Sequence, residues 1–266
     1  MSDELLVADD GSVRVLTLNR PQVRNAINST LGAALHEAIV AADADPAVDC
    51  LVITGAGAAA FSSGGDMKEM ASTDGPDMGG GARVITQALR HRPAKPMLAA
   101  VNGLAYGGGL ELLLACDLAV AGEHATFALP EVRRGVLASG GGLVHLPRLV
   151  GPRRALQLIL TGSPIDAATA LDWGLVNRVV PHDRVLTAAL ALAEVVAGNA
   201  PTAVRQTKRM LHRGGTASGS DWDDAWTGAD PWAANLEAMS TVFAHPDAVE
   251  GPTAFAHKRE PQWRDE

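Results

Sequence analysis

Two glutamates and a run of glycines are the residues of this chain best suited to chemistry. Gly107, Gly108 and Gly109 precede an apolar run that reads as a helix, and Glu111 falls in its first turn. Amides at a helix N-terminus lack internal acceptors and lie at the positive end of the helix dipole, so they can hold an oxygen that gains negative charge. Glu131 follows twenty residues after Glu111. Amide donors beside two carboxylates suit proton transfer at a carbon next to a carbonyl.

Each of these features is common when it occurs alone. A glutamate near a helix start more often stabilises the helix dipole, and a glutamate after Pro130 is more often a surface carboxylate. A second glycine-rich loop, Phe-Ser-Ser-Gly-Gly-Asp, covers residues 61–66. Its Asp66 fits a helix cap. Ser63 in this loop is disfavoured as a nucleophile because no motif places a histidine or an acid beside it.

The pattern of apolar residues predicts alternating strands and helices. Strands are predicted at residues 13–18, 49–55, 97–101, 117–121, 126–128 and 175–180. Helices are predicted at residues 30–44, 83–92, 151–160, 166–173, 183–198, 201–213 and 246–257. The alternation indicates an α/β fold that becomes mostly helical after Gly140. Loop composition predicts a mobile segment at residues 72–82.

Composition narrows the class of protein. With 266 residues, of which 47% are apolar and 20% charged, the chain can bury a sizeable core. The net charge of -8 argues against nucleic-acid or anionic-membrane partners, and no apolar run is long enough to span a membrane. We expect a cytoplasmic protein because the N-terminus lacks a signal pattern. Cys50 and Cys116 lie in apolar runs, which indicates buried thiols in a reducing compartment, and no histidine cluster has metal spacing.

The motifs become specific when they are taken together in order. They are Asn25-Ala26-Ile27-Asn28, residues 61–66, residues 102–111, Pro130-Glu131, and residues 160–162 with 170–176. This series resembles the crotonase family, the enoyl-CoA hydratase/isomerase superfamily, from about residue 5 to residue 260. The resemblance implies a crotonase-type spiral of β-β-α turns over residues 1–200 and a helical C-terminal region over 201–266. It also implies homotrimers, often paired into hexamers.

The resemblance assigns roles to the candidate residues. It implies that the backbone amides of Ser63 and Gly108 form an oxyanion hole for the thioester oxygen of an acyl-CoA. It also implies that Glu111 orients and helps to deprotonate a water, while Glu131 exchanges the proton at Cα. We therefore expect an enoyl-CoA hydratase of lipid and fatty acid metabolism. It would need no prosthetic group or metal, and coenzyme A would enter as part of the substrate.

Coenzyme A needs cations and backbone contacts. The resemblance implies that it is bound by Arg24, Ala26, Ser63, Gly64, Gly65, Asp66, Lys68, Gly108, Phe255 and Lys258, the last two reaching a neighbouring subunit's site. The chain departs from the family pattern after the second acid, where Arg133 and Arg134 are unusual neighbours. This departure leaves the accepted acyl chain open. Three alternative functions also stay open: a Δ3-Δ2 isomerase, a decarboxylase or thioester hydrolase on the same scaffold, and a non-catalytic acyl-CoA-binding protein.

Overall fold

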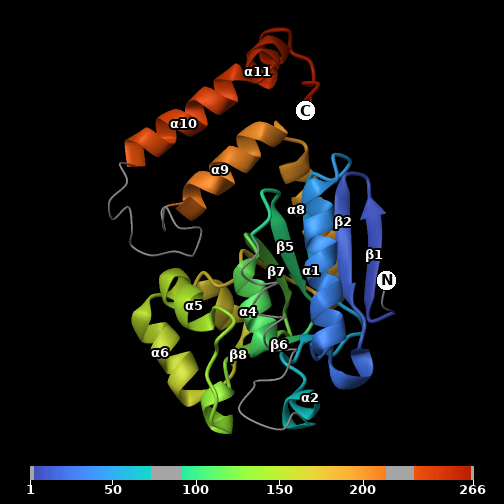
Figure 1. Ribbon diagram of the computed structural model, residues 1–266, viewed down its shortest axis with the longest axis vertical. Coiled ribbons are helices and arrows are strands. Elements are labelled where there is room, and N and C mark those ends of the chain that lie inside the picture. Colours follow the sequence, from blue (N-terminus) through green and yellow to red (C-terminus); the bar gives the residue numbers. More distant parts are fainter. Residues whose placement is uncertain (1–2, 73–91, 214–230, 265–266) are drawn as a thin grey trace.

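The computed structural model describes residues 3–72, 92–213 and 231–264. The described strands form two sheets with helices packed against them, and the last helices, after residue 200, extend beyond one end of the sheets (Figure 1). The strands are β1 Leu5–Asp10, β2 Val13–Leu18, β3 Cys50–Gly55, β4 Ala60–Ser62, β5 Met97–Val101, β6 Leu104–Tyr106, β7 Leu118–Gly122, β8 Thr126–Ala128, β9 Ile165–Asp166 and β10 Arg178–Val180.

Helices follow the strands throughout the first part of the chain and dominate the last part. The α-helices are α1 Ser29–Ala44, α2 Met67–Ser72, α4 Gly108–Ala115, α5 Gly142–Val150, α6 Pro152–Thr161, α7 Ala167–Asp172, α8 Val185–Ala197, α9 Pro201–Arg213, α10 Pro231–Ala244 and α11 Asp247–Ala256. The described residues also form the short 3-10 helices η1 Pro21–Val23, η2 Glu131–Arg134 and η3 His182–Arg184.

The order of the strands confirms the spiral of β-β-α turns. The larger sheet has the order β1-β2-β3-β5-β7-β10, and the smaller one has the order β4-β6-β8-β9. The consecutive pairs β3–β4, β5–β6 and β7–β8 each give one strand to the larger sheet and the next to the smaller sheet. Because β4, β6 and β8 pair in parallel, the loops that follow them leave the smaller sheet at the same edge.

The larger sheet is covered on both faces, which explains its continuous apolar strands. Alternate residues of β3 enter two different cores. Leu51 and Ile53 join the core that also contains α1 and α4, whereas Cys50 and Val52 join a second core under α8. The strand at 49–55 could be predicted for this reason, since every residue of β3 is buried.

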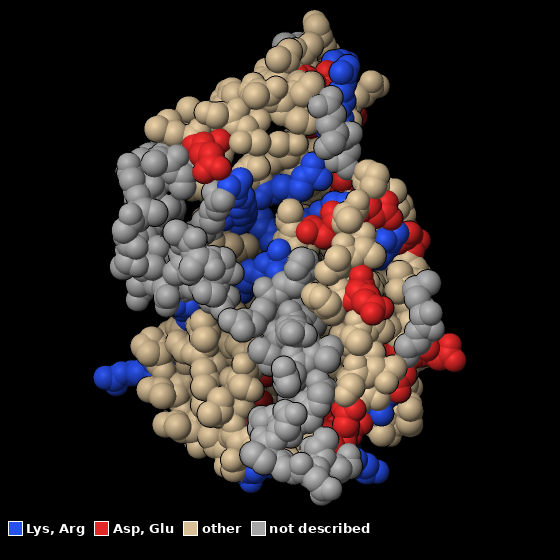
Figure 2. Space-filling view, viewed as in Figure 1, with Lys and Arg blue, Asp and Glu red and all other residues tan. Residues whose placement is uncertain are grey.

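An ion pair fastens α9 to the sheets. Lys208 Nζ lies 2.7 Å from one carboxylate oxygen of Asp117, and His212 Nε2 lies 2.8 Å from the other. Burial would raise the pKa of Asp117, but the hydrogen bond to His212 and the charge of Lys208 hold it below its ordinary value. Figure 2 shows Lys and Arg side chains gathered where α9 faces the rest of the molecule.

Most of the sequence predictions within the described residues are confirmed. The strands at 13–18, 97–101 and 126–128 and the helix at 201–213 have the bounds that were predicted. The strand at 175–180 is shorter, since only Arg178–Val180 pairs with β7. The strands β1, β4, β6 and β9 and the helix α10 were not predicted. The helix at 83–92 and nearly all of the loop at 72–82 lie outside the described residues.

Candidate active site

Two glycine-rich loops meet at the edge of the smaller sheet, after β4 and after β6. Gly64 has a φ of 91°, which strains any residue with a side chain. A Cβ at Gly64 would also lie 2.7 Å from the carbonyl oxygen of Tyr106 and 2.8 Å from the amide nitrogen of Gly108. Only glycine therefore lets the first loop lie against the start of α4.

The hydrogen bonds decide which amides of these loops can bind a ligand. The amide of Ser63 donates to the carbonyl of Arg24 at 2.9 Å, so the prediction that Ser63 supplies an oxyanion donor is wrong in this structure. The residues on either side of Gly65 pair with Ile27. The amide of Ile27 donates to the carbonyl of Gly64 at 2.8 Å, and the amide of Asp66 donates to the carbonyl of Ile27 at 3.0 Å. That parallel bridge leaves the Gly65 amide without an acceptor among the described residues.

Gly65 lies beside the helix N-terminus that the sequence singled out. A Cβ built on Gly108 would be 3.5 Å from the amide nitrogen of Gly65. Gly108 is the first residue of α4, and its amide also lacks an acceptor within the described residues. Gly65 and Gly108, rather than Ser63 and Gly108, are the neighbouring amides free to bind an oxygen.

Glu111 is buried in the first turn of α4, with 5% of its surface exposed. One of its carboxylate oxygens accepts a hydrogen bond of 3.0 Å from the amide of Gly142, the first residue of α5. Burial raises the pKa of Glu111 to about 7, the Gly142 amide opposes this rise, and the charge of Glu131 adds to it. Both protonation states of Glu111 are therefore well populated at neutral pH.

Glu131 begins η2 and is partly buried. Its Oε2 is buried and has no hydrogen-bond partner in the part of the chain that the structure describes. A Cβ on Gly107 would lie 3.1 Å from its Oε1. Burial raises the pKa of Glu131, and the charge of Arg134 opposes that rise. This carboxylate oxygen is therefore available to accept a hydrogen bond, or to carry a proton, within the site.

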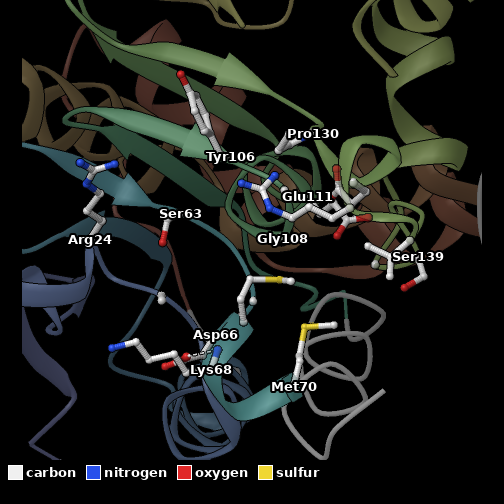
Figure 3. A pocket seen from close by; sticks show the side chains of 18 of the residues that line it. Arg24, Ser63, Asp66, Lys68, Met70, Tyr106, Gly108, Glu111, Pro130 and Ser139 are labelled. Carbon is white, nitrogen blue, oxygen red and sulfur yellow. Dashed lines mark hydrogen bonds between the residues drawn. The ribbon is translucent and has the colours of Figure 1, made fainter. Parts of the chain in front are cut away.

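Glu111, Glu131 and the free amides line one cavity of about 450 Å³. Figure 3 shows Glu111, Gly108 and Ser139 on one side of it and Arg24, Ser63 and Lys68 on the other. Its walls are largely apolar, and the lining residues include Val23, Ala26, Met67, Met70, Leu104, Pro130, Val136, Leu137, Ser139 and Gly140. The structure thus brings both predicted carboxylates to the cavity that the two glycine loops border.

The other predicted coenzyme A residues divide into three groups. Arg24, Ala26 and Lys68 line the cavity. Asp66 also borders it, but its carboxylate pairs with Arg20 at 2.9 Å and caps α2. Phe255 and Lys258 are exposed at and after the end of α11, away from the cavity of this chain (Figure 1).

Several lining residues escaped the sequence prediction. Met67, Met70 and Leu137 are apolar but partly or well exposed, and no motif marks them. Gly65 was expected to contact coenzyme A and not to supply an oxyanion donor. Its amide is free because of the pairing with Ile27, which the sequence does not reveal. The departure from the family pattern at Arg133 and Arg134 did indicate a feature of the site, since Arg134 lines the cavity.

The described residues hold no candidate metal site and no single candidate membrane span. No group of three or more His, Cys, Asp or Glu side chains there could hold a metal ion. Among those same residues, no helix by itself has the length and hydropathy to cross a membrane. Within the described residues, the bent helix pair His182–Ala197 and Pro201–His212 meets the length and hydropathy criteria only when the two helices are taken together.

Comparisons with known proteins identify the family of this chain. Residues 8–266 match the family model described as enoyl-CoA hydratase/isomerase. This chain belongs to the enoyl-CoA hydratase/isomerase family. It is a member of this crotonase family and an enzyme of the acyl-CoA hydratase and dehydratase type.

Crotonase relatives match over nearly the whole chain. The mevalonyl-coenzyme A hydratase of Aspergillus fumigatus is 39% identical over 95% of this chain and 91% of its own length. The carnitinyl-CoA dehydratase of Escherichia coli K12 is 36% identical over 99% of both chains. Among solved structures, an enoyl-CoA hydratase from Mycobacterium tuberculosis H37Rv is 35% identical over 100% of both chains, with a TM-score of 0.88. One from Bacillus anthracis is 32% identical over 99% of this chain and 100% of its own, with a TM-score of 0.91.

Proposed function

We propose that this crotonase adds water across the double bond of a 2-enoyl-CoA thioester. One observation carries the proposal: two carboxylates with raised pKa values line the same cavity as two neighbouring free amides. In this reaction negative charge moves to the thioester oxygen while water joins Cβ and a proton joins Cα. The two amides can stabilise that oxygen, and the two carboxylates can transfer the protons.

The amides act on the thioester carbonyl. Its oxygen binds between the N–H groups of Gly65 and Gly108, where negative charge develops as water attacks. One such donor typically lowers the barrier by about 3–4 kcal/mol. Both donors come from backbone, so the loops hold them in place before substrate arrives and no side chain must reorganise.

The carboxylates move the protons. Glu111 in its ionised form orients the water and accepts its proton, and its pKa of about 7 keeps that form available at neutral pH. Glu131 in its protonated form gives a proton to Cα, and its buried Oε2 has no other partner. The same groups run the reverse reaction, which fits relatives named as a hydratase and as a dehydratase.

The cavity also offers places for the rest of the thioester. Arg24 and Lys68 supply cations for the phosphates of coenzyme A, and Ala26 lines the same cavity. No prosthetic group enters the mechanism. Two unpaired thiols, Cys50 and Cys116, suit a reducing compartment such as the cytoplasm.

We also propose that the chain works as a homo-oligomer, a trimer or a pair of trimers. Large apolar side chains on α9–α11 are exposed in the single chain, among them Leu211, Phe243, Val249 and Phe255 at 70% or more. Packing against a second subunit would cover them and could bring Phe255 and Lys258 to a neighbour's coenzyme A.

A substitution series tests the proposed reaction. The purified protein is assayed on enoyl-CoA thioesters from short to long acyl chains, following loss of the conjugated enoyl absorbance. Glu131→Gln should lower kcat by roughly a hundred- to ten-thousand-fold while butyryl-CoA still binds. Crotonyl-CoA hydration that survives this change would refute the assignment. Glu111→Ala separates the alternatives, because an isomerase can work with one carboxylate and a hydratase of this design cannot.

A further inference from the structure

The two arginines that follow Glu131 have opposite surroundings. Arg133 is anchored, since its Nε donates to the carbonyl of Thr161 at 2.8 Å and its Nη2 to Oγ of Ser163 at 2.7 Å. Arg134 lines the cavity and forms no hydrogen bond or ion pair with the described residues. The Arg133 bonds fix η2 to the end of α6, and so they hold Arg134 at the cavity wall.

Arg134 is exposed, and its guanidinium lines the cavity without a partner among the described residues. Arg134 lies three residues from Glu131 on η2, and the wall continues with Val136 and Leu137. Burial raises the pKa of Glu131 and the charge of Arg134 opposes that rise, although the two side chains do not form an ion pair. A guanidinium presents a planar set of donors that matches a carboxylate, and an apolar acyl chain would leave those donors without acceptors.

The position of Arg134 distinguishes it from the cations proposed for coenzyme A. Arg24 follows η1 and Lys68 lies in α2, so both belong to the side of the cavity that Figure 3 shows opposite Glu111. Arg134 instead shares a short helix with the proton donor, at the end where the acyl group reacts. An anion held there belongs to the acyl group and not to the phosphates.

We propose that Arg134 determines specificity by binding a carboxylate on the acyl group, so that the substrate is a monothioester of an unsaturated dicarboxylic acid. This inference rests on the proposed function for its acyl-CoA substrate and names that substrate's class. The acyl carboxylate accepts hydrogen bonds from the Arg134 guanidinium while the thioester oxygen lies between Gly65 and Gly108. Charge-assisted bonds of this kind correspond to roughly a ten- to hundredfold change in affinity.

Binding of saturated thioesters tests the inference without turnover. Titration calorimetry compares glutaryl-CoA, which carries a distal carboxylate, with butyryl-CoA, which does not. The wild-type protein should bind glutaryl-CoA at least tenfold more tightly. Arg134→Leu should remove that preference while butyryl-CoA binding is kept, and Arg134→Lys should keep part of it. Arg153→Leu removes an exposed arginine outside the cavity and should change neither affinity.

Two results would overturn the inference. One is equal binding of the two thioesters by the wild-type protein. The other is an Arg134→Leu variant that weakens glutaryl-CoA, butyryl-CoA and free coenzyme A by the same factor, because Arg134 would then contact the coenzyme A portion. Crotonyl-CoA hydration is measured separately, so a protein that hydrates enoyl-CoA without any charge preference refutes this inference alone. A glutaryl-CoA preference without hydration of any enoyl-CoA refutes only the proposed reaction.

Discussion

Glu111 should make the protein less stable at neutral pH, and Glu111→Gln should reverse this. Its pKa rises from an ordinary value of 4.5 to about 7, chiefly because the side chain is buried. Between those two values the unfolded chain loses the proton while the folded protein keeps it. Stability therefore falls as the pH rises through this window, and it is fully retained below the lower value.

The size of the effect follows from the two pKa values. At about 1.36 kcal/mol for each pH unit, the ionised Glu111 costs roughly 3 kcal/mol of folding free energy above pH 7. Glutamine has nearly the same shape, carries no charge, and can still accept the hydrogen bond from Gly142. Glu111→Gln should thus be more stable than the wild type by up to about 3 kcal/mol at pH 8, and by much less at pH 4.5.

Urea denaturation of both proteins across this pH range measures the difference. Equal protein concentrations are needed, because association would add to the apparent stability. Glu123→Gln is a matched control, since Glu123 is exposed. Its difference from the wild type should stay constant with pH. The same Glu111→Gln protein should lose hydratase activity by roughly two to four orders of magnitude. A variant that is less stable at pH 8 than at pH 4.5, relative to the wild type, would refute the reasoning.

Two further changes test other parts of the structure. Asp117→Asn should destabilise the protein by roughly 3 kcal/mol at pH 7 in urea denaturation, because Lys208 keeps a buried charge without its partner. The pKa of Asp117 is lowered, so its contribution to wild-type stability should be lost as the pH falls below about 4, and an unchanged midpoint would contradict the ion pair. Gly64→Ala should lower kcat/KM for crotonyl-CoA at least tenfold and cost roughly 1–3 kcal/mol of stability, since its Cβ would meet backbone of Gly108 at a strained φ. Full activity of that variant would argue against the close approach of the two loops.

Much of the larger sheet could be predicted because burial on both faces leaves a plain apolar pattern. The strand 97–101 is an example, with every residue buried. The smaller sheet is different, since β4 and β6 have three residues each and are too short to show a period. Strand pairing of this kind is set by contacts between segments far apart in the sequence.

The candidate site likewise contains residues that the sequence predicts and residues that only the folded structure reveals. Glu111 and Glu131 could be predicted from motifs because their positions along the chain follow the family's order. The choice between Ser63 and Gly65 as amide donor could not, because it depends on hydrogen bonds to Arg24 and Ile27 nearly forty residues away. The sequence indicated that Arg134 departs from the family pattern. Only the folded structure shows that Arg134 lines the cavity while Arg133 donates to the carbonyl of Thr161 at the end of α6.

The most direct test of the central claim is the fate of labelled water. Crotonyl-CoA is incubated with the wild-type protein in oxygen-18 water, and the products are analysed by mass spectrometry. Water addition at Cβ predicts 3-hydroxybutyryl-CoA with one labelled oxygen on the hydroxyl group, and almost none from Glu131→Gln. Free coenzyme A with label in a carboxylate, or no labelled hydroxyl at all, would contradict the account.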